Sequence, residues 1–310
     1  MIDGYNVTNI IVSQIYGYNL YLKGRITLNA YLFIPQKELQ DSGLYVTLNG
    51  VRYPVSEAAT RVVDGRTLYT FSVEKNAKEY HDAETLRLYG SAGNLLTLYR
   101  QNEDVTESGW SYSVQTYLDR ALEVSDDPYL KELVTAMNDY GSYAQQFFRY
   151  NLANRSPILG DSGSVTKADL EKYRSTVVYA KDADGNDRTG VTHSGSSLLL
   201  QSDTIIRHYF TIDEGSIDDY TFTARGQALT PTATTDGAYY VEITDVYAKH
   251  LDNDFALTVS DSKGTVMTLH YSALSYAYAA MEQSDQDLID VVKALYRYNQ
   301  KASAFFDKEG

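Results

Sequence analysis

Hydrophobic and polar positions alternate through residues 25–35. The apolar set on one face is Ile26, Leu28, Ala30, Leu32 and Ile34. A period of two is typical of a strand with one buried face. Further strands are predicted where apolar residues stand between turn signals, at residues 44–48, 52–55, 68–73, 85–89 and 95–100. Asn49-Gly50, between the first two of these runs, indicates a β-hairpin.

A helical period follows the strands. Residues 125–128 read Ser-Asp-Asp-Pro, which supplies capping oxygens and a proline suited to the first helical position. Beyond them, apolar residues recur every three or four positions as Leu130, Leu133, Val134, Met137, Tyr140, Ala144 and Phe147. The long aromatic residues on this stripe are compatible with a binding groove, but we expect the stripe to pack in the core. A shorter helix is predicted over residues 117–123, so that the two helices form a hairpin.

The helical segment occurs twice in the chain. Ala136, Tyr140, Ala144, Phe147 and Phe148 recur 158 positions later as Ala294, Tyr298, Ala302, Phe305 and Phe306. The strands repeat too, with Leu28 and Ile206 at an offset of 178, Ala77 and Ala248 at 171, and Tyr112 and Tyr271 at 159. The offset changes only across turn-like stretches, as expected of a duplicated domain. Second-copy strands are predicted at residues 204–212, 220–224, 239–243, 255–260 and 265–271, and a short helix at 276–281.

These patterns predict a mainly β chain of the α+β class. We expect two tandem Ig-like antiparallel β-sandwich modules, each followed by a C-terminal helical hairpin. The first module takes residues 1–153, a linker rich in Ser, Gly and Pro takes 154–164, and the second module takes 165–310. Residues 174–180 and a turn at 182–186 are expected to join the second sandwich.

Composition narrows the classes of function. The net charge of -14 argues against nucleic-acid binding, which needs a basic surface. The absence of cysteine excludes thiolate catalysis, disulfides and zinc held by sulfur. No apolar stretch is long enough for a spanning helix, so we expect no direct membrane insertion.

Aromatic residues are the first candidate site, because the chain has 29 Tyr and a single Trp. Tyr16 and Tyr18 alternate along one strand face with Leu20, and Trp110 is expected in a loop beside the helical hairpin. Exposed aromatics of this kind stack on sugar rings or anchor protein partners, although strand filling is the other interpretation. In the second copy Ser194 and Ser196 replace the two tyrosines, so such a site would belong to the first module alone.

Catalytic patterns are weak. None of the five histidines has the spacing of a metalloprotease, and nucleophile-elbow and phosphate-loop motifs are absent. His208 is unusual because it aligns with Ala30 on the inward-facing row, which indicates either a buried structural histidine or a pH-sensitive one. A hydrolase would need paired carboxylates about 5–9.5 Å apart, and no pattern among the 41 acidic residues selects a pair.

Asp182, Asp184 and Asn186 begin like a calcium loop. The spacing then fails, since the sixth position is Asp187 instead of Gly and the twelfth is His193 instead of Glu. Asp-Gly within this segment is also a good hairpin turn. We therefore expect no cofactor other than, at most, calcium at these three residues.

Three segments stand out as motifs: the helix at residues 133–150, Ser-Asp-Thr-Ile-Ile-Arg-His-Tyr-Phe-Thr-Ile at 202–212 and Tyr-Ser-Ala-Leu-Ser-Tyr-Ala-Tyr at 271–278. Together they resemble a recurrent unit of large multi-domain surface proteins of Clostridia of Ruminococcus and Lachnospiraceae type. The likeness covers most of residues 20–310. Its motifs are packing residues, so no catalytic residue carries over.

The resemblance implies an extracellular or cell-wall-associated module. The chain opens within sequence that looks folded and lacks a signal peptide's basic start and apolar run, so we expect it to be part of a longer protein whose export signal lies outside it. Our first hypothesis is a non-catalytic scaffold or adhesion module that engages a polysaccharide or protein. The alternatives are a carbohydrate-binding module that uses exposed aromatics, and a hydrolase.

Overall fold

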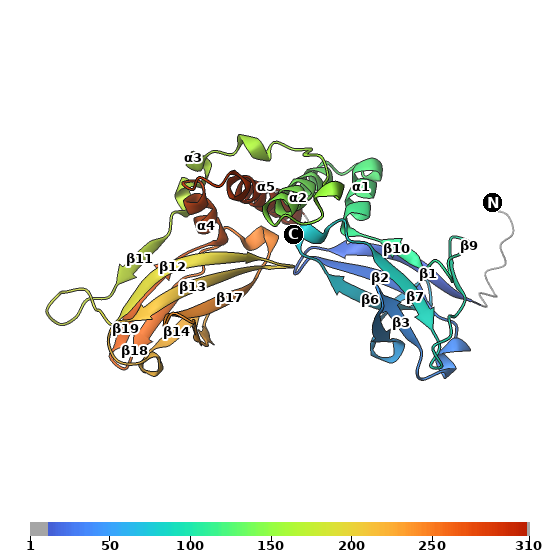
Figure 1. The fold of residues 1–310 in the computed structure, drawn as a ribbon, viewed down its shortest axis with the longest axis horizontal. Helices are drawn as coiled ribbons and strands as arrows, with labels where there is room; N and C mark the ends of the chain where they lie inside the picture. Colours follow the sequence, from blue (N-terminus) through green and yellow to red (C-terminus); the bar gives the residue numbers. More distant parts are fainter. Residues whose placement is uncertain (1–11, 309–310) are drawn as a thin grey trace. The chain divides into compact units, whose positions relative to one another are not determined.

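The computed structural model describes residues 12–308, so the first eleven residues of the predicted module 1–153 lie outside the described part. In this range the chain forms four mainly antiparallel sheets and five α-helices, a mixed fold in which strands predominate (Figure 1). None of these helices is both long and apolar enough to cross a membrane. The chain divides into two compact units, one formed by residues 12–22, 26–75 and 80–120 and the other by residues 23–25, 76–79 and 121–308.

The first unit contains two sheets. The six-stranded sheet has the order β5 (Ala59–Val63), β6 (Arg66–Glu74), β2 (Thr27–Phe33), β1 (Ser13–Tyr21), β8 (Leu98–Arg100) and β9 (Glu103–Asp104). The four-stranded sheet has the order β10 (Trp110–Tyr112), β7 (Glu84–Tyr89), β3 (Tyr45–Leu48) and β4 (Val51–Pro54). Neighbouring strands are antiparallel except β1 and β8, which are parallel.

The predicted period of two in residues 25–35 is confirmed by β2. Leu28, Ala30 and Leu32 point inward and have no exposed surface. The predicted hairpin is also confirmed, because Asn49 and Gly50 connect β3 to β4 with φ angles of 48° and 84°. Two successive positive φ values define the tight turn whose twist matches that of paired strands.

The second unit also contains two sheets. One has the order β11 (Thr176–Tyr179), β19 (Gly264–His270), β18 (Leu257–Asp261), β14 (Thr221–Ala224) and β15 (Gln227–Leu229), and the other β12 (Val191–Leu200), β13 (Thr204–Ile212), β17 (Tyr239–Val246) and β16 (Thr232–Ala233). The turn between β14 and β15 has positive φ at Arg225 and Gly226, 176 positions after the β3–β4 turn. Strands β1 and β12 each carry a β-bulge, just before Gly17 and Gly195, which are 178 positions apart.

The helices are α1 (Val114–Val124), α2 (Pro128–Phe147), α3 (Lys167–Leu170), α4 (Ala273–Ala280) and α5 (Gln286–Lys308). The predicted start of α2 is confirmed. The Asp127 side chain caps the helix by accepting a hydrogen bond from the Tyr129 N–H, and Pro128 occupies the first turn. Helices α1 and α4 match the two shorter helices predicted from the sequence.

Helices α2 and α5 pack side by side in the second unit (Figure 1). Lys308 at the end of α5 pairs with Asp127 at 3.1 Å, whereas Arg149 beyond the end of α2 pairs with Asp287 at 2.6 Å. The helices are therefore antiparallel. Between these ion pairs the rings of Tyr140 and Tyr298, which are equivalent in the sequence repeat, stack with centroids 5.6 Å apart.

The segment predicted as a linker, residues 154–164, is tied to α2 by a buried carboxylate. Asp139, 1% exposed, accepts hydrogen bonds from the backbone N–H groups of Leu159 at 2.8 Å and Gly160 at 3.0 Å. Because Asp139→Ala would leave these donors without their partner, we expect it to lower the free energy of unfolding by about 2 kcal/mol. Urea unfolding measures this loss, and limited proteolysis near residue 160 should become faster. The exposed Asp126→Ala is the control, and equal effects of the two variants would refute this role of Asp139.

Candidate functional site

The β-bulge in β1 separates two of the aromatic residues singled out from the sequence. Ile15 pairs with Leu32 and Gly17 with Tyr31, so Tyr16 is the extra residue of the bulge. Its ring is 43% exposed, and its hydroxyl donates a hydrogen bond to Asp64 at 3.1 Å. The bulge interrupts the alternation, and Tyr16 and Tyr18 therefore do not form one continuous platform.

The structure instead brings Tyr18 and Trp110 together. Their rings lie 5.4 Å apart, and Trp110 stacks on Tyr112 at 4.5 Å. The predicted loop position of Trp110 is wrong, because this residue begins β10 and pairs with Leu86 of β7. Trp110 is only 4% exposed, so its indole faces are already covered by protein. This aromatic cluster packs as core.

The loop with the candidate calcium ligands is a hairpin turn. One carboxylate oxygen of Asp182 accepts hydrogen bonds from the backbone N–H groups of Asp184 and Asn186, both at 2.9 Å. Lys181 pairs with Asp187 across the base of the turn at 2.7 Å. No group of three or more acidic, histidine or cysteine side chains arranged to hold a metal occurs within residues 12–308. Calcium at this loop stays a prediction.

His208 is fully buried in the second unit, as its alignment with Ala30 suggested. Its Nδ1 atom lies 2.7 Å from the Ser196 hydroxyl, which is also 2.9 Å from Nε2 of His193. The ring of Tyr271 lies edge-on to the His208 ring at 4.9 Å. Burial lowers the pKa of His208 to about 3, so this imidazole is neutral near pH 7.

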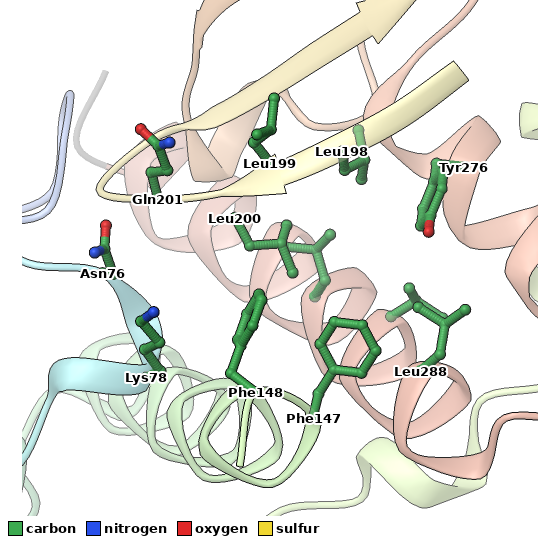
Figure 2. Close-up of a pocket in the computed structure, with 12 residues that line it drawn as sticks. Asn76, Lys78, Phe147, Phe148, Leu198, Leu199, Leu200, Gln201, Tyr276 and Leu288 are labelled. Carbon is green, nitrogen blue, oxygen red and sulfur yellow. The ribbon is translucent and has the colours of Figure 1, made fainter. Parts of the chain in front are cut away.

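A cavity of about 540 Å³ with a partly apolar lining lies in the second unit (Figure 2). Three groups of residues form most of its wall: Phe147 and Phe148 at the end of α2, the run Leu198–Leu200 at the end of β12, and Leu288, Val292 and Leu295 on α5. Tyr276 of α4 closes a further side. The volume and apolar lining are typical of a site that receives a small molecule or a large apolar group.

Local sequence explains how two of these walls form. Leu288, Val292 and Leu295 have the i, i+4, i+7 spacing that places side chains on one helical stripe. Helix α2 ends at Phe147, and the left-handed φ of 54° at Arg149 turns the chain away after Phe148. The rings of these two phenylalanines contact each other edge to face, with centroids 4.9 Å apart and an interplanar angle of 72°.

Polar groups gather on one side of the cavity. Figure 2 shows Asn76, Lys78 and Gln201 on this side. The Lys78 ammonium lies 5.1 Å from the ring centroid of Phe148 and 5.5 Å from that of Tyr150. Contacts of this kind hold a cation over aromatic faces. Lys78 is the only charged residue among those that line the cavity.

The sequence favoured packing for these wall residues, with a binding groove on the helical stripe as the alternative, and did not indicate the cavity's other walls. Two signals were present: three consecutive leucines, which break the period of a half-buried strand, and the Phe-Phe pair that extends the helical stripe past its end. All three leucines are half-buried, and Phe148 is 39% exposed. Fully packed core residues do not retain such exposure.

Comparison of the chain with known protein-family models and with curated proteins finds no match. The functional assignment therefore depends on the cavity and its lining residues.

Proposed function

We propose that this chain is a non-catalytic binding module of a larger extracellular or cell-wall-associated bacterial protein, and that its cavity receives an apolar group. The observation that carries the proposal is the 540 Å³ cavity walled by leucine, phenylalanine and valine side chains. Its lining includes no histidine, carboxylate or serine, the usual participants in hydrolysis. The resemblance to clostridial surface proteins supports the location.

We further propose that the chain is a tandem duplication of an Ig-like β-sandwich followed by a helical hairpin, with the predicted modules 1–153 and 165–310. Each unit has two mainly antiparallel sheets with inward-facing alternate residues, which supports the sandwich. The bulges at Gly17 and Gly195 and the turns at Asn49 and Arg225 recur at the offsets of the sequence repeat, which supports the duplication.

A carbohydrate-binding module is the less favoured alternative. That function needs a row of exposed aromatic faces, because a sugar ring stacks on an open aromatic surface. Tyr16 is exposed, but Trp110 is buried and Tyr18 packs against it. The burial of Trp110 against Tyr18 leaves Tyr16 as the single exposed ring of the three, which favours a scaffold with a different binding site.

A neutral apolar dye such as Nile red tests the cavity. We expect its emission to rise on binding, and we expect Leu200→Asp to weaken its affinity about tenfold, because the new carboxylate would be desolvated by the apolar ligand. Fluorescence titration measures the dissociation constant.

Leu159→Asp is the matched control for this experiment. Leu159 is 50% exposed and does not line the cavity, so the same substitution there should leave dye affinity unchanged. Circular dichroism of both variants establishes that they are folded. No dye binding, or equal loss in the two variants, would reject the cavity as the binding site.

A further inference from the structure

The chemistry of the cavity indicates the class of its ligand, an inference that rests on the proposed binding function. We propose that the cavity binds an amphipathic carboxylate, with its aliphatic chain against the leucine and phenylalanine wall and its carboxylate at Lys78.

The distribution of polarity sets the orientation of the ligand. Asn76, Lys78 and Gln201 lie together on one side, whereas the side chains of the remaining lining residues are hydrocarbon except for the Tyr276 hydroxyl (Figure 2). A molecule that is apolar throughout would desolvate the Lys78 ammonium without giving it a polar partner. A molecule with one polar end satisfies this ammonium and still buries its chain.

Lys78 indicates that the polar end of the ligand is negatively charged. Within residues 12–308 the contacts of its ammonium are the rings of Phe148 and Tyr150, and no carboxylate lies within ion-pair distance. The neighbouring Glu79 is directed elsewhere, because it accepts hydrogen bonds from the backbone N–H and the side-chain amide of Asn76. Lys78 therefore retains hydrogen-bonding capacity for an anionic group.

The charge of the cavity lining also distinguishes anionic from cationic and neutral amphipathic ligands. The chain carries a net charge of -14, so an anion is repelled by the protein as a whole and gains only where a cation faces it. The only charged group in the cavity lining is positive. An alkylammonium ion would meet this ammonium at the polar side, and a neutral alkanol would gain no ion pair there.

The test compares straight-chain carboxylates of about six to twelve carbons with their methyl esters, by isothermal titration below the micelle concentration. We expect each added methylene to tighten binding up to about fourfold until the cavity is full, which corresponds to ~0.8 kcal/mol. We expect the carboxylate to bind about tenfold more tightly than its ester.

Lys78→Met should remove this preference for the carboxylate and leave ester affinity within about twofold, because methionine keeps the apolar stem without the charge. Lys249→Met is the matched control. Lys249 is the repeat equivalent of Lys78 and lies 6.0 Å from the Phe306 ring, but it does not line the cavity.

The outcomes separate the two proposals. Equal binding of carboxylate and ester, or no change with Lys78→Met, would overturn the carboxylate assignment while an apolar binding site remains. If neither ligand nor Nile red binds, the proposed function itself fails. Loss of the preference in Lys78→Met but not in Lys249→Met would support the assignment.

Discussion

Trp110→Ala is expected to lower the free energy of unfolding of the first unit by about 3–5 kcal/mol, the usual cost of truncating a buried tryptophan. Trp110 is 4% exposed and contacts the rings of Tyr18 and Tyr112. The substitution would leave a cavity among aromatic side chains. Urea unfolding followed by far-ultraviolet circular dichroism measures the loss, because the variant has no tryptophan to report by fluorescence.

Two further variants give this prediction its controls. Tyr16→Ala should change stability by no more than about 0.5 kcal/mol, because that ring is 43% exposed. Trp110→Phe should cost less than Trp110→Ala, since it keeps an aromatic ring and removes an indole N–H that is buried without a hydrogen-bond partner within residues 12–308. A Trp110→Ala variant of unchanged stability that lost polysaccharide binding would instead favour the carbohydrate-binding alternative.

Local patterns predicted the elements that depend on local physics. The period of two placed β2, the Asn49-Gly50 dipeptide placed the β3–β4 turn, and the Ser-Asp-Asp-Pro sequence at residues 125–128 placed the start of α2. Each signal acts between residues close together in the chain. Side chains alternate between the two faces of a strand, Gly tolerates the positive φ angle of the turn, and a side-chain oxygen caps the first turn of the helix. These interactions span only a few residues, so the sequence states them directly.

The bulge and the cavity were not predictable in this way. One extra residue at Tyr16 redirects the strand; Gly17 is compatible with a bulge, but Gln-Ile-Tyr-Gly-Tyr does not show which residue is the extra one. The cavity combines segments near residues 76, 147, 199 and 292, whose proximity arises from tertiary packing. The pairing of α2 with α5 likewise depends on complementary surfaces. The apolar stripe that recurs in both helices, with Tyr140 and Tyr298 at equivalent positions, indicated only that each helix packs against another apolar surface.

Acidification from pH 7 to pH 5 is expected to destabilise the second unit through His208. Burial and, second to it, the neighbouring His193 lower the folded-state pKa of this imidazole to about 3, whereas an unfolded histidine titrates near 6.5. Between these values the unfolded chain binds more protons. Stability is therefore fully present above pH 6.5 and is lost as the pH falls toward 3. The expected loss is roughly 2 kcal/mol at pH 5, measured from urea unfolding curves at each pH.

His208→Ala separates this histidine from the carboxylates, which also titrate on acidification. The first copy has Ala30 at the equivalent position, so alanine is a residue that this strand accepts. The variant should be less stable at pH 7, because it leaves a cavity and removes a partner of the Ser196 hydroxyl, yet its stability should fall less between pH 7 and pH 5.

Val241 pairs with His208 from β17, and Ser196 and His193 face it from β12, so His193 is the titratable neighbour on these strands. Burial lowers the pKa of His193 as well. The free energy of unfolding of His208→Ala should therefore still fall with pH, and it should fall less steeply in the double variant that also carries His193→Ala. Parallel stability curves for the wild type and His208→Ala would show that the buried imidazole contributes nothing to the acid sensitivity.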